Sequence, residues 1–234
     1  EISNKISLLS YKLCVTNEGE IMKLQVCFDM TDIDKALDIA KQVEPYVDIF
    51  EIGSLLIDAH GAEVVQQFRT AFPDKTLLAD TKIVDRGNKT AKMFYDAGAD
   101  WVTVMAGTSD EVIASVCQAG DTAGNKKVML DLIDSDSYAQ SALDAQNLGV
   151  DAIMYHMAHD SLENQTDFFI DTWELVRENT KLPIFIAPRS NLDDLEETII
   201  QRRPAGLIIG SAICKADDPA KVAEHFAQLI KKKD

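Results

Sequence analysis

The sequence lacks the features that mark a secreted, membrane-spanning or disulfide-bonded protein. Charged residues interrupt every hydrophobic stretch, so no apolar run reaches the roughly 18 residues that cross a bilayer. The four cysteines, at positions 14, 27, 117 and 214, form no C-x-x-C pair and no zinc-binding spacing. We therefore expect free thiols in a reducing compartment, and a cytoplasmic protein that makes no contact with a membrane.

Basic residues are scarce as well. The chain has 23 Lys and Arg against 39 Asp and Glu, which gives a formal net charge of −16. Binding to nucleic-acid phosphates needs a clustered basic surface, so no nucleic-acid partner is expected. The Lys-rich run at 231–234 closes an expected helix, where cations complement the helix dipole. Small anionic substrates stay compatible with this charge, because a few local cations or amides can outweigh the global field.

Residues 1–21 differ from the rest of the chain. They have no basic start and no small-residue cleavage site, so they do not indicate a secretory signal. Met22 opens MKLQVCFDM, which has the pattern of a natural start followed by a strand. We interpret residues 1–21 as an extension or cloning remnant, with a segment covering one end of the fold as the alternative. Residues 22–234 contain no Pro, Ser or Gly-rich linker, which predicts one domain.

From Met22 onward, short apolar runs alternate with stretches of helical period. The amphipathic stretches include 32–43, 87–98, 136–149 and 218–233. Runs that are apolar throughout are typical of parallel strands covered on both faces. Eight strand–helix units favour an α/β protein with a single (β/α)8 TIM barrel over a doubly wound open sheet. The runs that predict strands are 24–29, 47–52, 76–80, 100–105, 127–132, 151–156, 182–187 and 205–210.

Polar residues follow most of the predicted strands. In a (β/α)8 barrel the chemistry lies at the C-terminal ends of the strands, so these residues are expected to meet at one mouth. In chain order they are Asp29, Glu51, Asp80, Lys82, Asp85, Asp131, His156, Arg189, Ser190, Gly210 and Ser211.

The stretch LLADTKIVDRG, residues 77–87, is the densest of these groups. Asp80 and Lys82 alternate with Thr81, so both side chains can point into the mouth. A lysine between carboxylates stays charged and can move a proton or hold an oxyanion. Asp85 begins the next loop and could face a neighbouring molecule. The alternative is an ion network that only fixes the loop. The other acids, expected at the same level at the ends of other strands, favour a catalytic role.

Two carboxylates on adjacent strands, Glu51 and Asp80, predict a divalent-cation site. Mg²⁺ prefers a few protein carboxylates together with water and substrate oxygens. The alternative is that one carboxylate bonds to Lys82 while the other caps a helix. His156 follows an apolar run, so it is either a catalytic group at the mouth or a satisfied core residue.

Several stretches together resemble one known family, the orotidine-monophosphate-decarboxylase suprafamily. The resemblance is to its Mg²⁺-dependent branch, 3-hexulose-6-phosphate synthase and 3-keto-L-gulonate-6-phosphate decarboxylase. It extends from residue 25 to about residue 219. The matching stretches are QVCFDMTDIDKAL, VDIFEIGSLLI, LLADTKIVDRG, DAGADWVTVMAG, DAIMYHMAHD and IIGSAICKADDP.

The resemblance implies a sugar-phosphate substrate and a Mg²⁺ ion held by Glu51 and Asp80. It places Lys82 against the substrate and His156 near the proton that moves. Both activities pass through a cis-enediolate, and the cation and the lysine neutralise its developing charge. The synthase forms the enediolate by deprotonating ribulose 5-phosphate and then adds formaldehyde, whereas the decarboxylase forms it by losing CO₂.

The resemblance also implies a homodimer, in which Asp85 reaches the site of the partner subunit. Asp29 would bind substrate hydroxyls. Gly210 and Ser211 offer backbone amides near the start of a helix, where a phosphate can bind.

The choice of branch depends on a few positions. Asp131 and Ser211 are like the synthase, since the decarboxylase typically has a glutamate near the first and a phosphate-binding arginine at the second. His156, with its spacing to Asp160, is more like the decarboxylase. We favour the synthase. The decarboxylase and a divergent non-catalytic sugar-phosphate-binding barrel are the alternatives.

One departure concerns the loop after the seventh strand. The family usually has a Gly-Gly pair there, whose amides grip the substrate phosphate, whereas this chain has Ala187, Pro188, Arg189 and Ser190. Proline has no N–H to donate. We expect the Arg189 guanidinium and the Ser190 hydroxyl to replace the missing donor.

Overall fold

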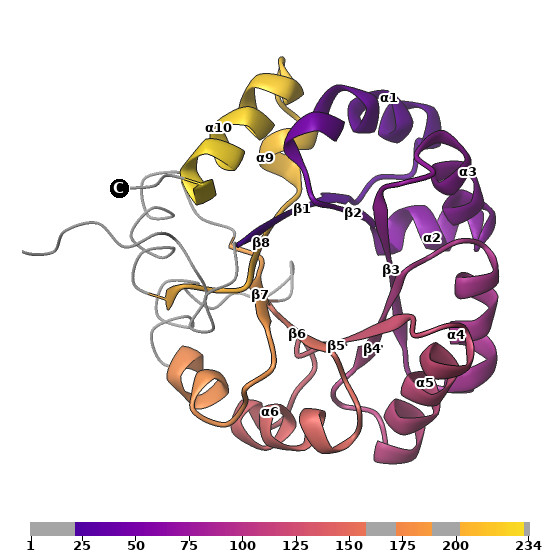
Figure 1. Cartoon of the computed structure of the whole chain (residues 1–234), viewed down its shortest axis with the longest axis vertical. Helices are drawn as coiled ribbons and strands as arrows, with labels where there is room; N and C mark the ends of the chain where they lie inside the picture. The colour runs from indigo at the N-terminus through magenta and orange to yellow at the C-terminus, as the bar shows by residue number, and fades with distance from the viewer. Residues whose placement is uncertain (1–21, 158–171, 189–201, 232–234) are drawn as a thin grey trace, which may run out of the picture.

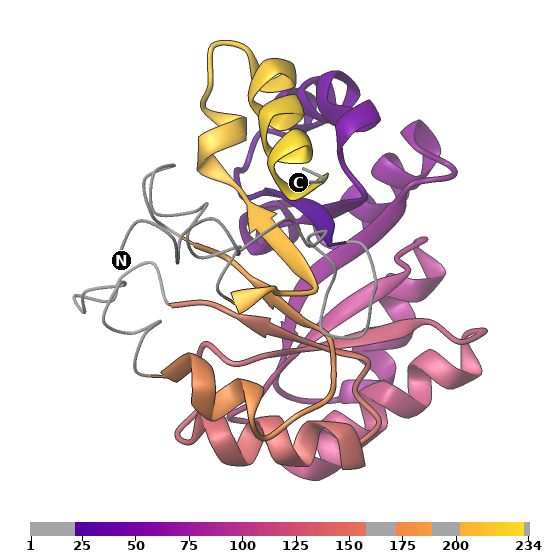
Figure 2. The same cartoon turned by 60° about the vertical axis from the view of Figure 1, so that its left-hand side comes forward.

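The computed structural model describes residues 22–157, 172–188 and 202–231. Eight parallel strands close into a barrel in the order β1 to β8, and helices surround it, which confirms the predicted (β/α)8 fold (Figures 1 and 2). The strands are β1 (Lys23–Phe28), β2 (Ile49–Ile52), β3 (Thr76–Ile83), β4 (Trp101–Met105), β5 (Lys127–Asp131), β6 (Ala152–Tyr155), β7 (Ile184–Ile186) and β8 (Gly206–Ile209).

The helices follow the strands as the amphipathic stretches predicted. Asp32 begins the first by accepting a hydrogen bond from the Lys35 amide at 3.0 Å. Within the described ranges, no helix is long and apolar enough to cross a bilayer. Besides a helical segment at 172–177, the helices are α1 (Ile33–Val43), η2 (Glu44–Tyr46), α2 (Ser54–His60), α3 (Glu63–Ala71), α4 (Gly87–Asp96), α5 (Asp110–Thr122), α6 (Tyr138–Asn147), α9 (Ser211–Cys214) and α10 (Pro219–Lys231).

Below the mouth, a cluster of buried apolar side chains fills the barrel interior. Side chains alternate along a strand, so the residue two positions after the last cluster member of each strand faces the same interior, nearer the mouth. This places the polar residues at the strand ends above a packed floor. The buried members of the cluster are Ile49, Leu78, Met129, Ala152, Met154, Phe185 and Ile208.

β3 is the strand whose end differs most from the prediction. It continues to Ile83, three residues beyond the expected end at position 80. Its register against β4 shifts between Ala79 and Ile83. Lys82 lies in this irregular part with a φ of 44°. The prediction stopped early because the charged residues after Ala79 resemble a loop, whereas hydrogen bonds to β4 keep them in the strand.

Near the N-terminus, two predictions concern residues outside the described ranges. Residues 1–21, interpreted as an extension, are among them, and so is Cys14. The other three cysteines, Cys27, Cys117 and Cys214, are free thiols.

The N-terminal end of the barrel is held by aspartates that precede three strands. Asp48, Asp100 and Asp151 accept hydrogen bonds from the backbone amide of the second residue of β1, β3 and β5, at 2.8, 3.0 and 2.9 Å. Each carboxylate therefore fixes the start of one strand against the next. This end of a (β/α)8 barrel contributes stability rather than chemistry.

Asp100 makes the most contacts of the three. Arg69 Nη2 lies 2.6 Å from one carboxylate oxygen and Lys126 Nζ lies 2.7 Å from the other. Burial alone would raise the pKa of Asp100, but the hydrogen bonds from Lys126 and the Leu77 amide, with the Arg69 charge, hold that pKa below its ordinary value.

Replacing Asp100 with alanine should lower the free energy of unfolding by about 2 kcal/mol, because a backbone amide and two cations lose their partner. Asp96→Ala, at an exposed ion pair of α4, is the matched control and should stay within about 0.5 kcal/mol. Because the pKa of Asp100 is depressed, its contribution is present at neutral pH and is lost as the pH falls through the folded-state pKa. Urea titrations that show equal stability at pH 7 would contradict this assignment.

Candidate active site

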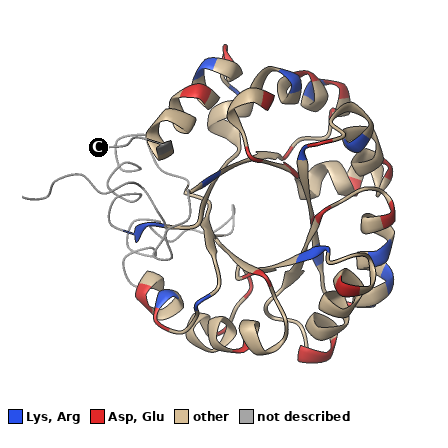
Figure 3. Cartoon of the chain, in the orientation of Figure 1, with Lys and Arg blue, Asp and Glu red and all other residues tan. Residues whose placement is uncertain are grey.

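Charged side chains from four strands form one connected cluster at the C-terminal end of the barrel. Lys82 Nζ, from β3, lies 3.1 Å from Asp80 Oδ2 and 2.7 Å from Asp131 Oδ2 of β5. Asp131 Oδ1 in turn lies 2.8 Å from His156 Nε2, directly after β6. Glu51 of β2 is close enough to Asp80 for the two charges to interact. Figure 3 marks charged positions on the inner strands as well as on the outer helices.

Asp131 is completely buried, and it contacts two basic side chains, Lys82 and His156. Burial would raise its pKa, but His156 and Lys82 lower the pKa of Asp131 to about 2. Burial also favours neutral Lys82, yet Asp80 and Asp131 raise the pKa of Lys82 above its ordinary value. Lys82 is therefore charged at neutral pH, beside a carboxylate that stays ionised.

The contact with Asp131 also defines the state of His156. A carboxylate accepts hydrogen bonds, so the ring carries its proton on Nε2, and Nδ1 is the nitrogen left to exchange a proton. Burial favours the neutral ring, but the Asp131 charge and hydrogen bond raise the pKa of His156. His156 is thus a strengthened base with a fixed orientation. Its catalytic role stays a prediction, as does the alternative of a satisfied core residue.

Glu51 and Asp80 form a buried acidic pair. Glu51 is only 3% exposed, and burial together with the Asp80 charge raises its pKa to about 7. Burial likewise raises the pKa of Asp80. Two buried carboxylates with raised pKa values are a site that a divalent cation would stabilise in its ionised form.

This donor set fits Mg²⁺ better than a metal that needs a complete protein cage. Among the described residues, no three or more His, Cys, Asp or Glu are grouped so as to hold a metal ion. Mg²⁺ instead binds through one or two carboxylates and keeps water or substrate oxygens for its other positions. Glu51 and Asp80 supply hard oxygens of this kind. When both are ionised, their two negative charges exceed the single positive charge of Lys82, so the site keeps a net negative charge.

Sequence reasoning missed two polar residues that support this cluster. Gln25, on β1, is fully buried and donates a hydrogen bond from Nε2 to Glu51 Oε2 at 2.6 Å. Thr103, on β4, is fully buried and donates to Asp80 Oδ1 at 2.9 Å. The available signal was a single polar residue within an apolar strand, since such residues are buried only when they have a partner.

Asp29 lies at the rim of the mouth. It is exposed, and its Oδ1 accepts a hydrogen bond from the Leu55 amide at the start of α2 at 3.1 Å. Gly53 makes this arrangement possible, because a Cβ at that position would lie 2.7 Å from the Phe28 carbonyl oxygen and 2.8 Å from Asp29 Cα. The carboxylate is thereby fixed where a substrate could reach it.

The structure does not bring Asp85 into the cluster of its own chain. Its side chain is 81% exposed, and within the described part of the chain its contacts are with the neighbouring Arg86, through the backbone amide at 2.7 Å and the guanidinium at 3.8 Å. Asp85 is therefore free to meet another molecule, and its predicted role at the site of a partner subunit stays a prediction.

The predicted phosphate-binding residues are only partly described. Gly210 and Ser211 lie between β8 and α9, where Ser211 begins a short helix. Arg189 and Ser190 lie outside the described residues, so the expected replacement of the Gly-Gly pair stays a prediction. His159 and Asp160, which bear on the choice of branch, are also outside them.

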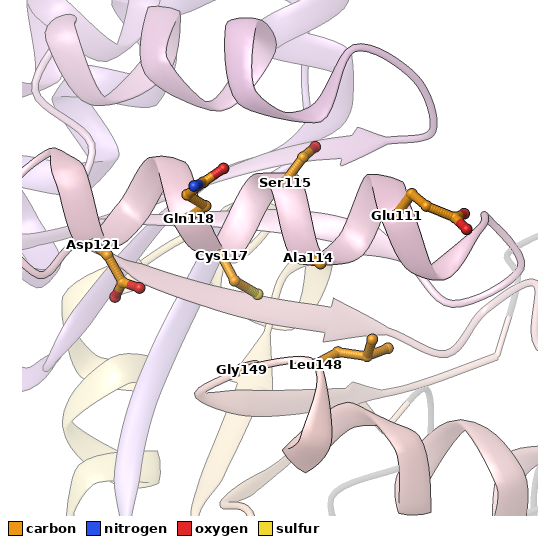
Figure 4. A pocket seen from close by; sticks show the side chains of 8 residues that line it. All are labelled: Glu111, Ala114, Ser115, Cys117, Gln118, Asp121, Leu148 and Gly149. Atoms are coloured by element: carbon orange, nitrogen blue, oxygen red, sulfur yellow. The ribbon is translucent and has the colours of Figure 1, made fainter.

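An open groove lies elsewhere, along α5 and the turn after α6, and none of the mouth residues lines it (Figure 4). Its lining residues are Glu111, Ala114, Ser115, Cys117, Gln118, Asp121, Leu148 and Gly149. The clustered charges, rather than this groove, locate the candidate active site.

Comparison with known proteins supports the same fold. Residues 22–226 match the orotidine 5'-phosphate decarboxylase / HUMPS family. A 3-hexulose-6-phosphate synthase from Bacillus subtilis (strain 168) is 32% identical over 209 residues, which cover 89% of this chain and 99% of the relative.

Two solved structures are similar along most of their length. The crystal structure of a 3-hexulose-6-phosphate synthase is 31% identical with a TM-score of 0.81, covering 89% of this chain and 99% of that one. The 3-keto-L-gulonate-6-phosphate decarboxylase of Vibrio cholerae O1 biovar El Tor is 25% identical with a TM-score of 0.76, covering 90% and 97%.

Replacing Glu51 with glutamine should stabilise the ion-free protein at alkaline pH, because it removes a buried charge. The pKa of Glu51 is raised from 4.5 to about 7, so the folded protein binds more protons and its stability falls as the pH rises through that window. The gain has an upper bound of about 3 kcal/mol at pH 8 and is smaller at pH 5.

Thermal and urea unfolding with a chelator present would test this prediction. Asp58→Asn, at an exposed position of α2, serves as the control and should stay within about 0.5 kcal/mol at both pH values. An equal effect of Glu51→Gln at pH 5 and pH 8 would show that Glu51 does not carry the raised pKa.

Proposed function

Because the chain belongs to the orotidine 5'-phosphate decarboxylase / HUMPS family, we propose that it is a Mg²⁺-dependent carbon–carbon lyase. Its reaction is that of a 3-hexulose-6-phosphate synthase, the aldol addition of formaldehyde to ribulose 5-phosphate. The observation that carries the proposal is the continuous chain of contacts from Asp80 through Lys82 and Asp131 to His156, with Glu51 beside it. The name of the Bacillus subtilis relative supports the choice of substrate.

Each group has a role that follows from its contacts. Glu51 and Asp80 would hold the Mg²⁺ ion, which supplies Lewis-acid stabilisation to oxygens that gain negative charge. The Lys82 ammonium, held charged by Asp80 and Asp131, adds a fixed positive charge at the same place. Because these groups are already oriented and partly desolvated, little reorganisation is needed when the substrate ionises.

Proton transfer is assigned to His156. Its Nε2 proton is committed to Asp131, so Nδ1 takes the proton from the ketose-phosphate carbon next to the carbonyl group. Asp131 strengthens the base and stabilises the imidazolium that results. The carbon deprotonated in this way adds to the aldehyde carbon of formaldehyde, whose oxygen becomes an alkoxide. The imidazolium of His156 returns the proton to this alkoxide, which gives the product hydroxyl and restores the neutral base. Asp29 at the rim, and the backbone amides near Gly210 and Ser211, would position the substrate hydroxyls and phosphate.

Decarboxylation of 3-keto-L-gulonate 6-phosphate is the second candidate. The similar fold of the Vibrio cholerae enzyme favours it, as does His156 after Tyr155. The same groups would stabilise the charge left by CO₂ loss, and His156 would return a proton. A non-catalytic barrel that binds a sugar phosphate without turnover is the third possibility.

Formaldehyde-dependent consumption of ribulose 5-phosphate, assayed beside CO₂ release from 3-keto-L-gulonate 6-phosphate, separates the three. We expect the first activity, its loss with EDTA and its recovery with added Mg²⁺. Lys82→Ala should lower the rate by at least about 100-fold, because a fixed charge on the transition state is removed. Lys92→Ala, at an exposed ion pair of α4, is the matched lysine control and should retain the wild-type rate.

Two outcomes would contradict the synthase assignment. CO₂ release without formaldehyde-dependent consumption would replace it with the decarboxylase. If the protein bound either sugar phosphate tightly but turned over neither, the non-catalytic barrel would be favoured.

The proposed homodimer gives a separate test of Asp85. If Asp85 completes the site of the partner subunit, Lys82→Ala and Asp85→Asn chains combined in one dimer regenerate one intact site. Mixing the two inactive variants in equal amounts, with subunit exchange, should then restore about a quarter of wild-type activity. A mixture that stays inactive although mass spectrometry shows mixed dimers would place Asp85 at its own chain's site or at none.

A further inference from the structure

The irregular part of β3 is organised around a single residue of β4. Ala79 pairs with Val102 and Ile83 pairs with Val104, so residues 80–82 of β3 lie opposite Thr103 alone. Two residues are therefore in excess on β3, and regular ladder pairing is interrupted at the point where the charged residues occur.

Thr103 binds all three of the residues opposite it. Its hydroxyl oxygen accepts a hydrogen bond from the Lys82 amide at 2.8 Å and donates to Asp80 Oδ1 at 2.9 Å. Its carbonyl oxygen accepts from the Thr81 hydroxyl at 2.8 Å. One side chain thus joins a proposed metal ligand to the backbone of the proposed catalytic cation.

The backbone at Lys82 requires such support. Its φ of 44° is in the left-handed region, which costs a residue with a side chain on the order of 1 kcal/mol or more. A conformation of this kind persists only where surrounding contacts hold it. In the described structure these contacts are the Thr103 hydroxyl on the amide, and Asp80 and Asp131 on the ammonium group.

We propose that Thr103 is a positioning residue whose hydroxyl sets the relative placement of Asp80 and Lys82. This inference rests on the proposed function, because it gives those two side chains their roles at the ion and at the substrate. The hydroxyl must donate and accept at once, which serine can do and the isosteric valine cannot. Thr103 does not itself reach the substrate, since it is fully buried beneath the cluster.

Three variants test the hydroxyl specifically. Thr103→Val keeps the shape and loses the hydroxyl, and Thr103→Ser keeps the hydroxyl. Thr81→Val removes a hydroxyl from the same part of β3, but this hydroxyl donates to the Thr103 carbonyl and not to Asp80 or Lys82. Binding of Mn²⁺, followed by electron paramagnetic resonance without substrate, reports the ion site. Turnover of ribulose 5-phosphate with formaldehyde, resolved into kcat and KM, reports the chemistry.

Thr103→Val should weaken Mn²⁺ binding by about 10-fold and lower kcat by about 10- to 100-fold, because outer contacts of metal ligands have effects of this size. Thr103→Ser and Thr81→Val should stay within about 3-fold of wild type in both measurements. Thr103→Ala, which leaves room for a water molecule, takes the place of the valine variant if that variant does not fold. If Thr103→Val kept wild-type Mn²⁺ affinity and kcat, the inference would be overturned. It would also be overturned if Thr103→Ser or Thr81→Val lost as much ion affinity and kcat as Thr103→Val.

Failure of the proposed function can be told apart from failure of this inference. Absence of turnover in the wild-type protein would remove the assigned reaction but leave the Mn²⁺ comparison intact. A crystal structure of Thr103→Val depends on neither activity nor ion. It should show Lys82 outside the left-handed region and its contact with Asp131 lost. An unchanged cluster would overturn the positioning role.

Discussion

The buried carboxylate of Asp131 is the group on which the site depends. An ionised carboxylate cannot stay inside a protein without partners, and Asp131 has the side chains of Lys82 and His156 together with the backbone amide of Ile133. The same contacts raise the pKa values of Lys82 and His156, so they keep Lys82 charged and make His156 a stronger base. A single buried anion therefore prepares both an electrostatic stabiliser and a proton acceptor, and it does so before any substrate arrives.

Aspartates serve two purposes at the two ends of the barrel. At the N-terminal end, Asp48, Asp100 and Asp151 bind backbone amides near the start of neighbouring strands. At the other end, Asp80 and Asp131 bind side chains, and burial opposes their charge. The first arrangement stabilises the fold at neutral pH. In the second, Lys82 and His156 stabilise the Asp131 charge, whereas Glu51 and Asp80 keep raised pKa values, an unfavourable burial that a bound cation would relieve.

The sequence predicted the barrel well because its signals are local. Apolar runs and turn residues marked all eight strands, and their order placed Glu51, Asp80, Lys82 and His156 at one mouth. The predictions failed where contacts between distant segments decide the structure. β3 continues past Asp80 because Thr103, more than twenty positions later, replaces its lost ladder bonds. Gln25 was missed for the same reason, since only its contact with Glu51 distinguishes it from any polar strand residue.

The approach of β1 to β2 at Gly53 has a consequence for altering the protein. The Gly53 amide already bonds to the Phe28 carbonyl at 3.2 Å, and a Cβ there would collide with the backbone. A side chain at position 53 would have to displace the end of β1, and with it the Asp29 carboxylate at the rim of the mouth. Libraries that aim to change the range of substrates should therefore keep residue 53 as glycine and vary other rim positions.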